Sequence, residues 1–200
     1  MKPIITTALS AIVYTLLAFS SVSNAAEPSS NTPYEVPSFD FLHKHIPSSE
    51  NYQKQWHRMT GFEHSGLHWG LFVVIYTDIG QNVYKHNFLQ YSAWFDDPDD
   101  EENEPHYQQY PVGTQFIKEN YTMHNGKPGD AHSVTIMIKR QPGYNPKGGD
   151  WEYMQFNSQG ETIIQGSGVE ENVNQLCANC HEKIAERDYI FSNIFSGASQ

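Results

Sequence analysis

The chain has 200 residues, a formal net charge of −11 and an aromatic content of 14%. A chain of this acidity is a poor candidate for binding nucleic acid or an anionic membrane surface, because both repel carboxylates. The charge allows docking on a basic redox partner, although ordinary solubility is the favoured explanation. The length fits a single domain with a sizeable hydrophobic core.

Residues 1–25 have the features of a secretory signal peptide. Lys2 provides a positive start, an apolar stretch follows, and small residues precede Ala26, where we expect cleavage. A single membrane anchor is the alternative, but the apolar stretch is shorter than the roughly 20 residues of a membrane span, and Thr and Ser interrupt it. We therefore predict export to the periplasm, where loss of Lys2 takes the net charge from −11 to −12.

Residues 26–47 are rich in Pro, Ser and Asn and have little periodicity. They predict a linker or an arm that lies over the domain, which we expect to span residues 48–200. A helix is expected to begin at a cap on Ser48 or Ser49 and to end at Gly61.

Residues 68–76 are dense in β-branched and aromatic side chains and predict a strand that is buried on both faces. Residues 78–80 break this strand, and residues 82–95 predict a short helix. The acidic run at 96–104 favours either a cation site or a solvated loop of repelling carboxylates. It lacks the ligand spacing and the glycine of a calcium loop, which favours the solvated loop.

The second half of the chain is β-rich. Residues 113–121 predict a strand with alternating side chains, so that Lys118 shares a face with Phe116 while Glu119 lies on the other. A final helix is predicted over residues 170–185. Further strands are predicted at 132–139, 151–157 and 161–165, separated by turns at 125–129 and 158–160 and by a Gly/Pro loop at 142–149.

The last predicted helix contains the two cysteines of the chain, Cys177 and Cys180, followed directly by His181. This C-x-x-C-H pattern is typical of covalent attachment of a c-type haem. Two thiols at this spacing lie on adjoining faces of one helical turn and can form thioethers to two vinyl groups, while the imidazole binds the iron. A thioredoxin-type disulfide is expected near the start of a βαβ unit, and a zinc site needs a second ligand pair. Export and haem support each other, since c-type haem is attached outside the cytoplasm.

The second axial ligand of a small electron-transfer cytochrome is commonly a Met that follows the haem motif. No Met follows His181. We therefore predict that His181 is the one strong protein ligand and that the distal position is open, which suits ligand binding or catalysis. Four-helix bundles with a late haem motif do not fit the β-rich pattern. The methionines of the predicted mature chain all lie upstream of the motif: Met59, Met123, Met137 and Met154.

Several blocks of the chain, in this order, resemble the cytochrome P-460 family. They lie at residues 72–76, 113–119, 149–153, 177–181 and 188–191. The haem motif is shared with many cytochromes, whereas the ordered set of blocks is far more specific. The resemblance extends over roughly residues 56–195, which is most of the predicted mature chain.

The resemblance implies a mainly β (α+β) fold, with an antiparallel sheet and a few helices, of which the C-terminal one carries the haem motif. It also implies a homodimer with a single five-coordinate haem c in each chain. P-460 members carry an additional covalent bond from a lysine to the porphyrin ring, and Lys118 is the matching lysine. Those members oxidise hydroxylamine, with chemistry that involves nitric oxide, and pass electrons to a partner such as a soluble c-type cytochrome. The related cytochrome c′-beta branch lacks this bond and binds nitric oxide or carbon monoxide in an apolar pocket.

Lys118 has an alternative reading from the residues alone. An inward-facing lysine is costly unless it is paired, reaches solvent or is chemically consumed. It can therefore be a sheet-edge lysine that pairs with Glu119 or with the acidic loop.

The distal acid–base group is a second open position, because hydroxylamine oxidation has to remove protons near the iron. Oxidising members of the family carry a carboxylate on the strand before the block at 149–153, and this chain has Thr135 at the nearest position. His132, His124 or His68 can substitute, although such histidines are more typical of surface or packing positions. Thr135 in place of a carboxylate favours the alternative of a non-catalytic nitric oxide or carbon monoxide binding protein. A plain electron-transfer cytochrome is a third alternative, and it requires a sixth protein ligand.

Overall fold

The computed structural model describes residue 37 and residues 39–68 and 70–196. The predicted signal peptide at 1–25 and the first part of the predicted arm lie outside the described residues. Within the described part of the chain, no helix is both long and apolar enough to cross a membrane.

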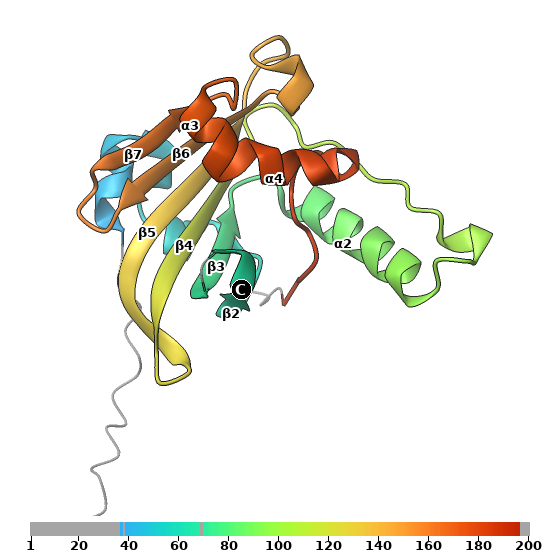
Figure 1. Ribbon diagram of the computed structural model, residues 1–200, viewed down its shortest axis with the longest axis horizontal. Coiled ribbons are helices and arrows are strands. Elements are labelled where there is room, and N and C mark those ends of the chain that lie inside the picture. Colours follow the sequence, from blue (N-terminus) through green and yellow to red (C-terminus); the bar gives the residue numbers. More distant parts are fainter. Residues whose placement is uncertain (1–36, 38, 69, 197–200) are drawn as a thin grey trace, which may run out of the picture. The chain divides into compact units, whose positions relative to one another are not determined.

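A single antiparallel sheet forms the centre of the described residues (Figure 1). Its strands follow the order β1-β3-β4-β5-β6-β7, and β2 pairs with β3 on the same edge as β1. All the pairings are antiparallel, which confirms the predicted mainly β class. The strands are β1 (His57–Arg58), β2 (Glu63–Ser65), β3 (Leu71–Thr77), β4 (Gln115–His124), β5 (Lys127–Lys139), β6 (Trp151–Asn157) and β7 (Thr162–Gly166).

Short helices surround the sheet, and a longer one, α2, has 16 residues. A C-terminal helical segment runs from Glu171 to Arg187 and carries the haem motif, as predicted. The α-helices are α1 (Tyr52–Gln55), α2 (Gln81–Asp96), α3 (Glu171–Val173) and α4 (Asn179–His181). The 3₁₀ and π elements are η1 (Asp40–Lys44), η2 (Pro47–Ser49), η3 (Gly66–His68), η4 (Glu101–Asn103), η5 (Pro146–Gly148), η6 (Asn174–Ala178) and η7 (Glu182–Arg187).

The two faces of the sheet support two separate cores, as the alternation in β4 predicted. On one face, which we call the arm face, Ile117 and Tyr121 pack with Phe39 and Leu42 from the segment around η1. All four of these side chains are almost fully buried. Burying side chains of this size stabilises the fold by about 1.5–3 kcal/mol each.

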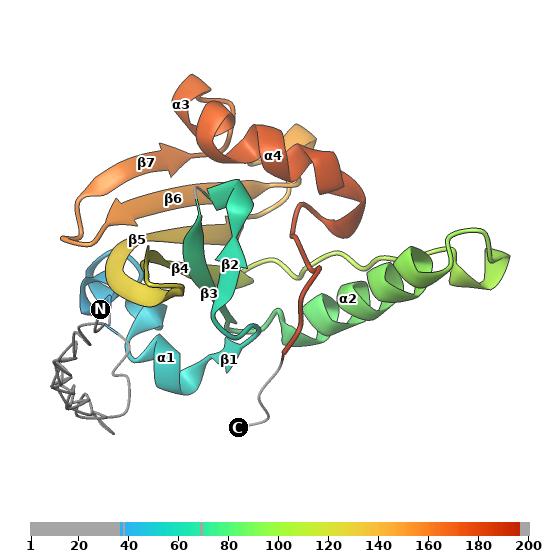
Figure 2. The ribbon, with the colours of Figure 1, turned by 60° about the horizontal axis from the view of Figure 1, so that its bottom comes forward.

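The opposite face, which we call the C-terminal face, carries Phe116, Met137 and Tyr153. These side chains pack with Val173 and Ala178 of the C-terminal helical segment. Figure 2 shows this segment lying along β6 and β7. The haem motif therefore lies against the C-terminal face and away from the arm face.

The predicted helix that ends at Gly61 is wrong over most of its length. Only Tyr52–Gln55 is helical, and Trp56 already has an extended backbone. The following two residues pair with Tyr76 and Thr77 on β3, so sheet pairing overrides the helical pattern. The α1 turn begins after Asn51, not after a serine cap.

Other element boundaries differ by a few residues for local reasons. The strand predicted from residue 68 begins at Leu71, because η3 and the positive φ of Gly70 precede it. The turn after β4 is tighter than predicted, since Asn125 and Gly126 both have positive φ and form a two-residue hairpin turn. The C-terminal helical segment is not a uniform α-helix, because it contains the π turn η6 and ends as the 3₁₀ helix η7.

The predicted helix at 82–95 is confirmed as α2, and the acidic run continues from its end. Every carboxylate between Asp96 and Glu104 is exposed. Among the described residues, no group of three His, Cys, Asp or Glu side chains is placed to hold a metal ion. The carboxylates of the acidic run are therefore in contact with solvent, as in the favoured alternative.

Candidate haem site

Cys177 in η6 and Cys180 in α4 lie within about one turn of the C-terminal helical segment. Cys177 is buried against the C-terminal face, whereas Cys180 is exposed. Both are free thiols. The pair therefore presents one inner and one outer sulfur on the same side of a short helical stretch, which suits the two vinyl groups of a haem edge.

His181 is held in one orientation by its neighbours. Its Nδ1 lies 2.6 Å from the backbone carbonyl oxygen of Tyr189, and its ring meets Tyr153 and Phe191 edge to face. A carbonyl oxygen only accepts hydrogen bonds, so Nδ1 carries the proton and Nε2 is left as the metal ligand. This arrangement is the usual support of a metal-binding histidine.

Burial lowers the pKa of His181 to about 4. The hydrogen bond to Tyr189 opposes this effect, and the positive charge of Lys118 adds to it. The imidazole is therefore neutral at neutral pH, which is the form that binds a metal.

Lys118 belongs to a row of half-buried side chains across four strands of the C-terminal face. Ile75 on β3 pairs with Lys118 on β4, Lys118 with Thr135 on β5, and Thr135 with Gln155 on β6. Their neighbours along the strands on this face, such as Phe116, are buried. The row thus forms a partly open strip of the sheet close to the haem motif.

The charge of Lys118 acts to lower the pKa of both Cys177 and His181. Lys118 therefore lies near these two side chains of the haem motif. Burial lowers the pKa of Lys118 itself to about 8. The alternative pairing with Glu119 is wrong, since Glu119 lies on the arm face and is fully buried there. Lys118 makes no ion pair within 4 Å in the part of the chain that the structure describes.

Thr135 lies beside Lys118 in this row. Its Oγ1 accepts a hydrogen bond of 3.3 Å from the Asn120 side-chain amide. Asn120 also donates to the hydroxyl of Ser133 at 3.2 Å. Thr135 therefore belongs to a neutral polar group on the C-terminal face, beside Lys118.

His68 is the one of the three alternative histidines that lies near the haem motif. Burial, with smaller contributions from the charges of Lys118 and His181, lowers its pKa to about 3. Its Nδ1 lies 2.6 Å from Ser65 Oγ, and the register places Ser65 on the C-terminal face. His124 and His132 are both exposed, and Nδ1 of His132 lies 3.1 Å from Ser133 Oγ.

Two features of the site could not be found from the motif alone. The Tyr189 carbonyl binds Nδ1 of His181, but a backbone acceptor has no side-chain signature. Asp188 and Lys139 form a buried ion pair beside it. The sequence offered only a weak signal for this pair: Lys139 directly follows the apolar residues 136–138, and Asp188 directly precedes the apolar residues 189–191.

The residues fit a covalent haem. Two free thiols, a neutral imidazole with an open Nε2 and a partly open strip of sheet lie together. The Tyr153 hydroxyl, next to His181, is buried and has no hydrogen-bond partner among the described residues, so it can donate to a bound group. A mainly β fold whose last helical segment carries two haem-attaching cysteines and a ligating histidine defines a c-type cytochrome in which the haem motif follows the sheet in the chain.

Residues 78–192 match the family model of cytochrome P460. The chain therefore belongs to the cytochrome P460 family and is a c-type haem protein, as the resemblance implied. A search of curated proteins found no match.

Proposed function

We propose that the chain is an exported redox cytochrome that acts on hydroxylamine or nitric oxide at an open iron position. The observation that carries this proposal is the place of Lys118, on the C-terminal face and within electrostatic reach of Cys177 and His181. Bound at these residues, a haem supplies an iron that exchanges electrons with a small nitrogen compound. His181 would bind the iron, and Cys177 and Cys180 would attach the ring through thioethers.

Lys118 is suited to become a second attachment point. With its pKa lowered to about 8, a sizeable fraction of its amine is neutral and nucleophilic near neutral pH. The attachment replaces an N–H bond of Lys118 and a C–H bond of the ring by an N–C bond. It releases two protons and two electrons, which an external two-electron oxidant has to accept.

His68 and Thr135 are the candidate groups for moving protons on the open side. Hydroxylamine loses protons as it is oxidised, and a neutral imidazole can accept them. With Nδ1 of His68 bonded to Ser65, Nε2 is free to act. Attachment of Lys118 removes a positive charge that depresses the pKa of His68, so the tether makes His68 a stronger base.

The surroundings of the protein are part of the same proposal. The sequence features of residues 1–25 support export to the periplasm, and the net charge of −11 supports docking to a basic partner such as a soluble c-type cytochrome. We expect a homodimer, as in other members of the family.

The test is mass spectrometry of the digested holoprotein, followed by turnover with hydroxylamine and an electron acceptor. We expect the Lys118 peptide to be joined through haem to the peptide of residues 177–181. Lys118→Arg should keep both thioethers and lose this joint, whereas Lys127→Arg, at an exposed lysine, should change neither. A free, unmodified Lys118 peptide from the natural holoprotein contradicts the attachment, and turnover no faster than that of free haem contradicts the enzyme.

A second candidate is a nitric oxide or carbon monoxide binding protein of the cytochrome c′-beta kind. The observation that favours it is the chemistry of the row on the C-terminal face, where Ile75, Thr135 and Gln155 offer no carboxylate. Tight binding of nitric oxide together with absent hydroxylamine turnover would support it. An electron-transfer role needs a sixth protein ligand, so a high-spin, ligand-accessible spectrum contradicts that role.

A further inference from the structure

A buried ion pair lies next to the haem motif on the C-terminal face. Lys139 Nζ donates to both carboxylate oxygens of Asp188, at 2.6 and 2.8 Å. Only 10% of the Lys139 side chain and 3% of the Asp188 side chain are exposed. Lys139 Nζ also lies 5.1 Å from the centre of the Trp151 ring. A buried pair of this kind is weak evidence for stability by itself, so its position is the informative feature.

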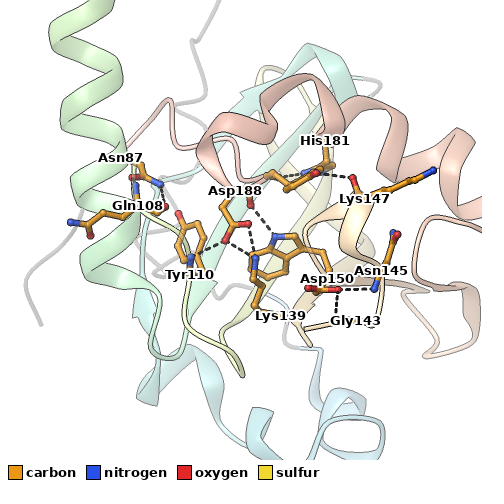
Figure 3. A network of polar contacts seen from close by, with 12 residues as sticks. Asn87, Gln108, Tyr110, Lys139, Gly143, Asn145, Lys147, Asp150, His181 and Asp188 are labelled. Carbon is orange, nitrogen blue, oxygen red and sulfur yellow. Dashed lines mark hydrogen bonds and ion pairs between the residues drawn. The ribbon is translucent and has the colours of Figure 1, made fainter. Parts of the chain in front are cut away.

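The pair holds a sharp corner of the backbone that follows η7. Asp188 and Tyr189 have φ values of 52° and 65°, a region that residues other than glycine adopt rarely. The carboxylate of Asp188 also accepts from the Tyr110 backbone N–H at 2.8 Å. The carbonyl of Asp188 accepts from the Trp151 indole N–H at 2.9 Å. Asp188 is therefore anchored at both its side chain and its backbone, as Figure 3 shows for its contacts with Lys139 and Tyr110.

The next carbonyl along the chain is the one that His181 uses. With Asp188 fixed, the carbonyl oxygen of Tyr189 lies 2.6 Å from Nδ1 of His181. The Tyr189 ring is held too, since its hydroxyl donates to the Lys147 carbonyl at 2.8 Å. A continuous set of contacts thus runs from Lys139 on β5 to the imidazole.

We propose that Lys139 and Asp188 are positioning residues that fix the Tyr189 carbonyl on Nδ1 of His181 and thereby set how strongly His181 donates electrons to the haem iron. A well-placed acceptor on Nδ1 raises the basicity of the ligating imidazole. A more basic ligand favours ferric over ferrous iron, so the pair keeps the reduction potential low. Its role depends on His181 as the iron ligand, and it does not depend on which small molecule the iron binds.

The test uses the holoprotein with Asp188→Asn and with the double variant Lys139→Met/Asp188→Asn. The double variant leaves no unpaired buried charge, so it folds even where a single variant does not. We expect the iron–histidine stretching band of the ferrous protein to move to lower frequency in both. We also expect the reduction potential to rise by about 59 mV, which corresponds to a tenfold change in the ratio of ferrous to ferric protein for a one-electron couple.

The matched control is the neighbouring ion pair between Arg140, directly after β5, and Glu152 on β6. Arg140 bonds to Glu152, and neither residue contacts the corner at Asp188. Arg140→Gln should leave the stretching frequency and the potential unchanged. If the folded double variant keeps the natural frequency and potential, the proposal is wrong. Neither readout requires hydroxylamine, so failure of the proposed enzyme activity leaves this test intact.

Discussion

The chemistry at residue scale depends on how a few side chains share one strip of sheet. Burial, with the charge of Lys118 as a smaller cause, lowers the pKa of both His68 and His181, so both imidazoles are neutral at neutral pH. Burial disfavours the charged form of Lys118, and a covalent attachment would remove this charge. Perturbed groups gathered beside a cofactor motif are typical of a functional site.

The role of His68 gives a prediction at this scale. His68→Gln keeps a hydrogen-bonding partner for Ser65 but removes the base, so we expect kcat/KM for hydroxylamine to fall about 10²-fold. The ferrous carbon monoxide spectrum should not change, since His181 and the thioethers are untouched. His124→Gln, at an exposed histidine at the end of β4, is the control for steady-state kinetics. Unchanged turnover in His68→Gln would exclude His68 as the proton acceptor.

At the scale of elements, the local sequence pattern predicts an element correctly where the pattern and the pairing of the sheet favour the same structure. The strand predicted at 151–157 has those bounds in the structure, because turns bound it on both sides and every residue fits a pleated, buried surface. The helix predicted to end at Gly61 failed, because the edge of β3 offers backbone pairing that a helical pattern cannot reveal. The haem motif could be predicted from the sequence because covalent attachment requires those residue types. The role of the Tyr189 carbonyl could not be predicted, because every residue type has a backbone carbonyl.

The loop before β6 supports the corner at Asp188 and gives the next prediction. Gly149 has a φ of 64°, and a Cβ there would lie 2.4 Å from the Tyr189 ring. Gly149→Ala should cost about 2–4 kcal/mol of unfolding free energy, from backbone strain and from overpacking. Gly143→Ala separates the two causes, since Gly143 has a φ of 98° and open space around it, and it should cost about 1–2 kcal/mol. Denaturant unfolding measures both, and equal losses would contradict a packing role for Gly149.

On the scale of the whole molecule, the two faces of the sheet have different roles. The C-terminal face carries the haem motif, while the arm face binds the segment from η1 to α1. The link on the arm face is polar as well as apolar. Glu119, fully buried on β4, accepts from the Tyr52 hydroxyl and the Gln53 amide of α1, and from the Tyr121 hydroxyl at 2.8 Å. The buried carboxyl group of Glu119 therefore connects α1 to the strand that carries Lys118.

This carboxyl group makes the stability of the molecule depend on pH. Burial raises the pKa of Glu119 above its ordinary value of 4.5, although its three hydrogen bonds and the charge of Arg58 oppose the shift. The folded state therefore binds this proton more tightly than the unfolded state, and the stabilisation, complete below pH 4.5, is lost as pH rises through the folded pKa. The slope contributed by one such group is at most about 1.4 kcal/mol per pH unit.

Glu119→Gln removes the titration while it keeps an acceptor for the hydroxyl of Tyr52. We expect the unfolding free energy of the natural protein to fall relative to that of the variant as pH rises above 4.5, as measured by urea unfolding between pH 4 and pH 8. Glu171→Gln, at an exposed carboxylate, should leave the pH profile of the natural protein unchanged. Because Glu119 faces away from the haem motif, the visible spectrum should also stay the same. Parallel profiles for the natural protein and Glu119→Gln would mean that this carboxylate stays charged in the core, stabilised by its donors in spite of its burial.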